Sequence, residues 1–282
     1  MWKRRSRMLV LANLCTSLFI LLQMGIYVTQ GLLGRASAYN LFDQCSNLLG
    51  TLGLSWMVYV MDAAVVYTLI TFLWVIGKQF YYSRRTYGKL LLHKHYDLTE
   101  QMNHTYSEGG SHILVVSHPE SLALTMGFIR PQIIVSTGML QLLDEDELEA
   151  LIQHETFHRN KKDPLKTFLM SICSSVLWYI PILTWSYKQY VTVREVLADA
   201  YAMNMTGSPE SLGSALLKLL RANPSKPYPF TYASFAESSI NYRIQHIIDP
   251  ETKLAFQWPV KSLLVSLQII GVISVLFLAE LL

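Results

Sequence analysis

Three apolar segments, each long enough to cross a lipid bilayer, constrain this chain more than any other feature of its sequence. They cover residues 9–33, 48–77 and 260–282; the first contains no charged residue, and the second contains only Asp62. A membrane-spanning helix needs about 20 mainly apolar residues. Only 15% of the 282 residues are charged, against about 25% in soluble domains. The sequence therefore predicts a mainly α-helical membrane protein.

Basic residues flank these segments unevenly and predict their orientation. Four precede the first segment and four follow the second, namely Lys3, Arg4, Arg5, Arg7, Lys78, Arg84, Arg85 and Lys89, while the loop between them holds only Arg35. Because cytoplasmic flanks are enriched in Lys and Arg, we expect the N-terminus and residues 78–259 in the cytoplasm. The first segment is longer than the roughly 7–15 apolar residues of a signal peptide, so we expect it to remain uncleaved.

Between the second and third segments, the pattern changes to that of a folded α+β domain with a small sheet. ILVVSH and PQIIVSTG are short, β-branched and bounded by turn residues, which favours strands, and SLALTMGF is a weaker candidate. The strand at 113–117 either offers an edge to which an extended substrate adds or is an ordinary sheet strand. LDEDELEALIQHETFHR predicts a helix with Asp144 as its N-cap and Glu147 as capping-box partner.

This helix carries the first half of a metal site. His154 and His158 are one turn apart and face the same way, and Glu155 lies beside them, placed to activate a metal-bound water. A catalytic zinc needs a third protein ligand, for which Glu195 is the best candidate. Asp199 is four residues further on, on the same helix face, and can hydrogen-bond a ligand histidine.

The two motifs also carry a family resemblance. RPQIIVSTGMLQLLDEDELEALIQHETFH followed by REVLADAYA resembles the membrane metallopeptidases typified by the β-lactam-sensing antirepressor proteases of the BlaR/MecR type. It is similar, more distantly, to the heat-shock and CAAX-processing membrane zinc proteases. The resemblance covers roughly residues 115–250 and implies a gluzincin fold with His154, His158 and Glu195 as zinc ligands and Glu155 as general base. We expect the extracellular sensor domain to be lacking, and DAYAM stands where those sensors usually show a Cys-Asp-Glu run.

One apolar segment between the two motifs decides whether this site can form. FLMSICSSVLWYIPILTW, residues 168–185, is about as apolar as a membrane helix and lies between the two motifs. A full crossing would leave Glu195 on the opposite side of the membrane from His158. Pro181 disfavours a continuous helix, and Lys166 and Lys188 suit the same side equally well. We therefore expect a re-entrant helical hairpin over about 167–187, bent near residues 179–181.

The expected activity is that of a zinc endopeptidase in which Glu155 takes a proton from zinc-bound water and passes it to the leaving amine. In NYRIQH, Arg243 is the first choice to stabilise the oxyanion, with Tyr242 and His246 as alternatives; Arg243 could instead only pair with a carboxylate such as Asp199. Residues 223–239 are expected to form a lid or a self-cleavage segment. Asp62 either acts in sensing or substrate access or forms a structural hydrogen bond.

The expected partners are a protein substrate and the lipid bilayer. The substrate is a cytosolic regulator such as a transcriptional repressor, or a membrane protein under quality control, and a homo-oligomer stays open. A net charge of +3 is too small to indicate direct nucleic-acid binding. The alternative function is a non-proteolytic membrane receptor or scaffold with a structural zinc site, which would need no general base at Glu155.

Overall fold

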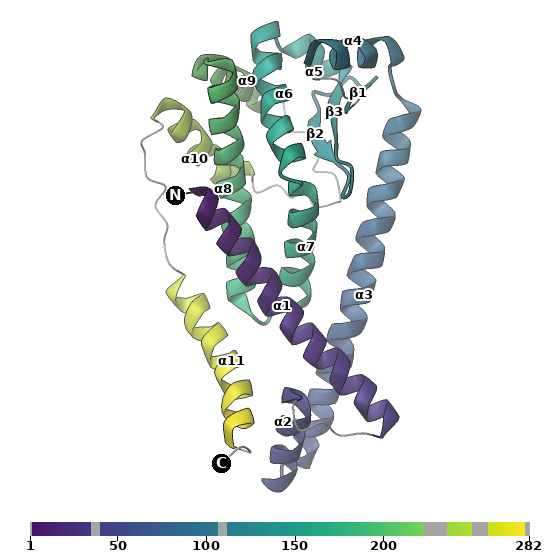
Figure 1. The fold of residues 1–282 in the computed structure, drawn as a ribbon, viewed down its shortest axis with the longest axis vertical. Coiled ribbons are helices and arrows are strands. Elements are labelled where there is room, and N and C mark those ends of the chain that lie inside the picture. The colour runs from purple at the N-terminus through teal and green to yellow at the C-terminus, as the bar shows by residue number, and fades with distance from the viewer. Residues whose placement is uncertain (1, 35–39, 107–111, 223–235, 250–258, 280–282) are drawn as a thin grey trace. The chain divides into compact units, whose positions relative to one another are not determined.

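The computed structural model describes residues 2–34, 40–106, 112–222, 236–249 and 259–279, without the side chains of 236–241 and 270–279. Its elements are, in chain order, α1 (Trp2–Leu33), α2 (Leu41–Thr51), α3 (Ser55–Leu92), α4 (Tyr96–Tyr106), β1 (Ile113–Val116), β2 (Ala123–Met126), β3 (Gln132–Ser136), α5 (Thr137–Leu142), α6 (Glu145–Asn160), α7 (Asp163–Val176), α8 (Pro181–Thr206), α9 (Pro209–Arg221), α10 (Ala236–Ile248) and α11 (Val260–Ala279) (Figure 1). The predicted class, mainly α with a small sheet, is confirmed.

The chain divides into two compact units. The first unit comprises residues 1–6, 79–168 and 188–256, and the second comprises residues 7–78, 169–187 and 257–282. The segment 223–235, most of the predicted lid or self-cleavage loop, lies outside the described residues.

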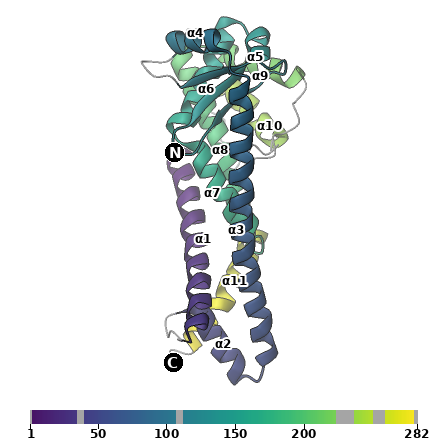
Figure 2. The ribbon, with the colours of Figure 1, turned by 90° about the vertical axis from the view of Figure 1, so that its right-hand side faces the viewer.

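Two helices, α1 and α3, are long and apolar enough to cross a membrane, by their length and composition. Both are unbroken over their length (Figure 2), which supports a membrane location. The second predicted segment is not one helix, because α2 ends at Thr51 and α3 begins at Ser55. Gly53 separates them with φ 71°, a left-handed conformation that ends helices and that glycine adopts without steric cost.

Two polar side chains of the second unit form hydrogen bonds between its helices. The hydroxyl of Tyr27, on α1, donates to Oδ1 of Asp62, on α3. Asn13 is buried in α1 and donates to the backbone oxygen of Leu183 at 2.9 Å. Because a carboxyl group within an apolar span is costly unless it is paired, the Tyr27 contact accounts for Asp62 structurally; a role in sensing stays a prediction.

The segment between the two sequence motifs forms a helix–turn–helix. Helix α7 ends at Val176, residues 177–180 form the turn, and Pro181 opens α8 (Figure 1). Proline is tolerated there because the first backbone N–H groups of a helix have no partner within it. The chain therefore turns back after α7, and His158 and Glu195 both belong to the first unit.

The sheet of the first unit has the order β1-β3-β2, with β1 parallel and β2 antiparallel to β3. The outer edge of β1 is covered by α4. Asn103 Oδ1 accepts from the backbone nitrogens of His112 and Ile113, both at 2.9 Å, and Thr99 Oγ1 accepts from Val115 N at 3.0 Å. Of the two interpretations of the strand at 113–117, the structure therefore supports the ordinary sheet strand, and β2 forms the other edge of the sheet.

Helix α6 begins as its sequence predicts. Asp144 Oδ1 accepts from Glu147 N at 2.9 Å, and Glu147 Oε2 accepts from Asp144 N at 3.0 Å, which completes the capping box. The helix packs its apolar side against the sheet, where Ile152 and Ile133 are fully buried. This packing fixes the helix face that carries the two histidines.

Candidate metal centre

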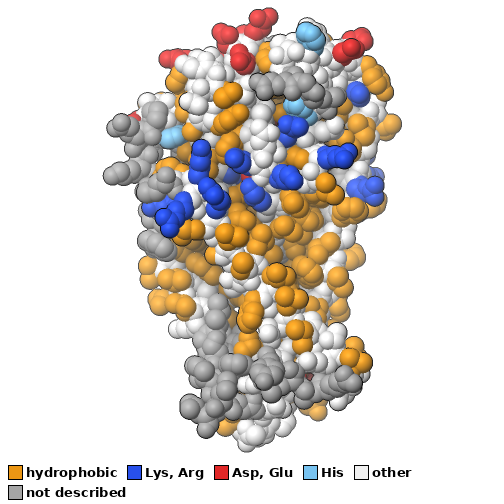
Figure 3. All heavy atoms as spheres, viewed as in Figure 1, with side chains coloured by type: hydrophobic (Ala, Val, Ile, Leu, Met, Phe, Trp, Pro, Cys, Tyr) orange, Lys and Arg blue, Asp and Glu red, His pale blue; other side chains and the backbone are white. Residues whose placement is uncertain are grey.

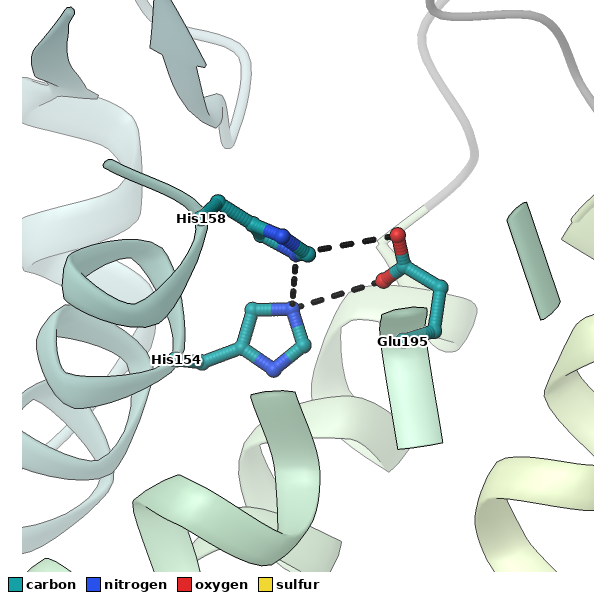
Figure 4. Close-up of side chains that lie close together, drawn as sticks. All are labelled: His154, His158 and Glu195. Atoms are coloured by element: carbon teal, nitrogen blue, oxygen red, sulfur yellow. Dashed lines mark hydrogen bonds and ion pairs between the residues drawn. The ribbon is translucent and has the colours of Figure 1, made fainter. Parts of the chain in front are cut away.

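Three buried side chains from two helices converge on one point. His154 and His158 extend from α6, and Glu195 extends from α8 toward them (Figure 4). The two Nε2 atoms are 3.2 Å apart, His154 Nε2 lies 3.4 Å from Glu195 Oε2, and His158 Nε2 lies 3.6 Å from Glu195 Oε1. The structure thus brings together the three residues that the sequence predicts as ligands.

These separations fit a tetrahedral metal ion. Ligand atoms held about 2.0–2.1 Å from a tetrahedral zinc lie about 3.3 Å from one another, close to the three measured values. Two imidazoles and one carboxylate are also the ligand set of a catalytic zinc site, which keeps its fourth position open. The donor set and its spacing therefore suit zinc.

A carboxylate lies behind each histidine. His154 Nδ1 is 2.9 Å from Asp199 Oδ1, and His158 Nδ1 is 2.9 Å from Asp163 Oδ2. Such contacts orient an imidazole and leave its Nε2 for a metal. The sequence predicts Asp199, which is the most buried residue of the group. The sequence does not predict a role for Asp163, because it lies outside both motifs and looks like the first residue of the next helix. Its position five residues after His158 is the only indication.

Arg243 joins the group from α10. Its Nε donates to Asp199 Oδ2 at 2.7 Å and its Nη2 donates to Asp199 Oδ1 at 2.8 Å, while Nη1 lies 3.7 Å from Glu195 Oε2. The guanidinium therefore takes the second of its two predicted positions, paired with Asp199. A bidentate pair of this kind is strong and directional, so Arg243 holds the carboxylate that orients His154.

Further residues that sequence reasoning missed hold Glu195 and Asp163. Arg194 is buried, and its Nε donates to Glu195 Oε1 at 3.0 Å while its Nη1 donates to the hydroxyl of Thr167. Tyr190 donates to Asp163 Oδ1 at 2.8 Å. Tyr190 and Arg194 are one turn apart on α8, but this spacing indicates no role until α7 is known to lie beside it.

The electrostatics of this group favour positive charge at the imidazoles. Burial alone would lower the pKa of both histidines, but Asp199 and Glu195 raise the pKa of His154, and Glu195 and Asp163 raise that of His158 to about 9. Burial opposes ionisation of Asp199, yet Arg243 and His154 lower its pKa to about 2. Likewise His158 and Arg194 hold the pKa of Glu195 well below its usual range. Carboxylates ionised beside two imidazoles attract a cation.

Glu155 is buried on α6 and does not belong to the converging ligand group. Its Oε2 accepts from the hydroxyl of Thr125, on β2, at 2.7 Å, and its backbone oxygen accepts from the same hydroxyl at 3.0 Å. Thr125 thus ties the carboxylate to the edge strand. Thr125 is thus another positioning residue without a sequence signal.

A pocket adjoins the centre on the side of β2. Its apolar wall is Leu124, Met126 and Phe128, and its polar wall is His158, Asp163, Thr167 and Arg194. The pocket therefore runs from the edge strand to one of the converging histidines.

The chain matches two kinds of known protein. Over 76 residues it is 29% identical to the regulatory protein BlaR1 of Bacillus licheniformis, covering 27% of this chain and 12% of that protein. Over 136 residues it is 27% identical to a protease HtpX homolog of Methanothermobacter thermautotrophicus, covering 40% of this chain and 53% of that protein. A protease HtpX homolog of Pyrococcus abyssi is 26% identical over 166 residues, 42% of this chain and 57% of that protein.

The chain spans about an eighth of the BlaR1 protein and little more than half of the HtpX homologs. The family comparison is broader. The model of the BlaR1 peptidase M56 family matches residues 27–247, a range that contains every residue of the centre described above. This chain therefore belongs to the BlaR1 peptidase M56 family.

Proposed function

We propose that this protein is a membrane-embedded, zinc-dependent endopeptidase of the gluzincin type. The observation that carries the proposal is the convergence of His154, His158 and Glu195 beside a buried Glu155 that is tied to an edge strand. The family match and the likeness to proteases support it. The alternative, a receptor or scaffold with a structural metal, leaves the presence of Glu155 without a reason.

The residues divide the chemistry among themselves. His154, His158 and Glu195 would hold the zinc ion, which supplies a Lewis acid for the scissile carbonyl and acidifies water. Glu155 would take the proton of the attacking water and return it to the leaving amine. Thr125 holds Glu155 in place through a hydrogen bond of 2.7 Å, so the base is oriented before a substrate arrives.

The edge strand β2 is the proposed binding place of an extended peptide. Because Leu122 O accepts from Ser136 N at 2.9 Å, the alternate residues Ala123 and Thr125 turn their backbone groups to the outer edge. Among the backbone hydrogen bonds of the described residues, none joins that edge to another segment. An added strand would pass the pocket of Leu124, Met126 and Phe128. The proposed substrate is a cytosolic regulator or a membrane protein.

The proposed topology is multi-pass, with the N-terminus and the first unit in the cytoplasm. It rests on the length of α1 and α3 and on the basic residues at their ends. Cysteine substitutions at exposed Lys89 and Arg221, probed in intact cells with a membrane-impermeant thiol reagent, test it. We expect both cysteines to be labelled only after the membrane is permeabilised. Labelling of intact cells would indicate the opposite topology.

The activity is tested on the full chain in detergent or nanodiscs with an unfolded protein as substrate. Cleavage by the wild type, loss of cleavage on removal of metal and recovery with zinc are expected. Glu155→Gln is expected to retain zinc and to lose about 10²–10⁴-fold in rate. Metal retention without cleavage by any form of the protein would favour the scaffold.

A further inference from the structure

The first unit carries a basic pocket outside the metal centre. It is lined by the β2–β3 turn, by the residue before β1, and by the last turn of α6 with the residues that follow it. Its cationic side chains are Arg130, Arg159 and Lys162. Among the described residues that line it, none is a carboxylate. On the face shown in Figure 3, Lys and Arg side chains gather in a band, and most of the visible carboxylates lie above it. We call this site the basic pocket.

Arg159 is the most informative member of the basic pocket. It is half-buried, and its Nε is shielded from solvent without a hydrogen-bond acceptor among the described residues. Its Nη1 donates to the exposed Asn160 Oδ1 at 3.3 Å. A buried donor without an acceptor is unfavourable, and an anion in the pocket would supply one.

Lys162 reinforces this interpretation. It has φ 52° and is the non-glycine residue with positive φ within the described part of the chain. Glycine takes this left-handed conformation without the steric cost that a side chain meets. Lysine at this position is therefore costly for the backbone, and Lys162 lines the basic pocket, where its charge would favour a bound anion.

The field in the basic pocket is positive. His112 lines the pocket, and burial followed by the neighbouring Arg159 lowers the pKa of its imidazole. The neutral imidazole leaves the two guanidinium groups and the ammonium to attract an anion. Guanidinium groups suit phosphate oxygens because they donate in pairs from a planar fork.

An exposed apolar side chain beside the basic pocket indicates what kind of anion it would bind. Ile129, at the tip of the β2–β3 turn and on the wall of the basic pocket, is 83% exposed. An apolar side chain beside several cations is typical of surfaces that lie on anionic membranes. We propose that the basic pocket binds the phosphate of an anionic lipid headgroup while Ile129 enters the adjoining apolar layer. An acidic protein segment would not require an exposed isoleucine.

The test uses the full chain in an uncharged detergent, titrated with an equal mixture of phosphatidylglycerol and phosphatidylcholine and observed by native mass spectrometry. The wild type is expected to bind its first phosphatidylglycerol about tenfold more tightly than phosphatidylcholine. The double variant Arg159→Gln, Lys162→Gln is expected to lose that preference. The matched control Lys89→Gln, Arg221→Gln removes two exposed cations from other places and should keep it.

Because Arg159 is half-buried, the exposed Arg130→Gln is a second variant that cannot act through the core; it is expected to weaken phosphatidylglycerol binding several-fold. Equal binding of the two lipids by the wild type would overturn the proposal, as would equal losses in the pocket and control variants. Tighter binding of inorganic phosphate or of a polyglutamate peptide at the same residues would assign the pocket to another ligand. None of these readings depends on peptidase activity.

Discussion

Asp163 Oδ2 lies 2.9 Å from Nδ1 of His158, so a carboxylate at the start of α7 orients a histidine of α6. Both side chains are buried, and Tyr190 holds the second oxygen of the carboxylate. The hairpin of α7 and α8 therefore does more than return the chain. It delivers Glu195 from one helix and the partner of His158 from the other.

Asp163→Asn is accordingly expected to weaken zinc binding about 10–100-fold while the fold is retained. The asparagine keeps the shape but loses the charge that favours a cation at His158. Competition with a chromophoric chelator measures the affinity. Lys166→Gln is the control, because it removes only a partly exposed ion pair to the same carboxylate, 3.5 Å long, and such pairs contribute little. Unchanged affinity in Asp163→Asn would exclude the orienting role.

Thr125→Val is expected to slow peptide cleavage about tenfold or more with zinc content unchanged. The substitution removes the hydroxyl that holds Glu155 Oε2 at 2.7 Å and keeps the branched side chain on β2. Thr125→Ser keeps the hydroxyl and should restore most of the rate. Equal rates for Thr125→Val and Thr125→Ser would show that this hydrogen bond does not position Glu155 for catalysis.

Zinc affinity and kcat, measured on two variants of Arg243, distinguish two possible roles of this residue. If it acts by holding Asp199, Arg243→Ala lowers zinc affinity and cleavage together, because the bidentate contact of 2.7 and 2.8 Å is lost. If it also stabilises the oxyanion, Arg243→Lys retains zinc yet lowers kcat by about 10²-fold or more. Zinc affinity and kcat measured on both variants distinguish these outcomes, and no effect on either would contradict both roles.

The capping box of α6 predicts a pH effect on stability. Burial opposes ionisation of Glu147, but hydrogen bonds from Lys218, Ser214 and Asp144 N lower its pKa. A carboxyl with a lowered folded pKa stabilises the fold above its unfolded value of about 4.3, and this contribution is lost as the pH falls through the folded pKa. The thermal stability of the wild type should therefore approach that of Glu147→Gln below about pH 4 and exceed it at neutral pH. A constant difference across this range would exclude the linkage.

How much of this arrangement the sequence could predict depends on whether its cause is local. Asp144 and Glu147 are three residues apart, so the start of α6 is predictable, and the histidine face follows from helical spacing. Glu195 and Asp199 are found by asking which helix could complete a zinc site. Gly53, which separates α2 from α3, lies in a run so apolar that the break is concealed.

The missed residues have tertiary causes. Asp163, Thr125 and Arg194 matter only because α7, β2 and α8 meet around α6, and nothing in their neighbouring sequence announces this. The same holds for the edge of β1, which Asn103 of α4 covers. Contacts that a side chain makes with another element, whether with its side chains or its backbone, are the part of this fold that periodicity and spacing do not reveal.

The central claim is that His154, His158 and Glu195 form one metal site, and zinc content tests it most directly. Full-length protein is purified in detergent as wild type, as Glu195→Ala and as Glu210→Ala, an exposed control on α9, and zinc is counted per chain by elemental analysis. The account predicts one zinc per chain in the wild type and in Glu210→Ala, and little or none in Glu195→Ala. Zinc-free wild type, or zinc equally retained in Glu195→Ala, would contradict it.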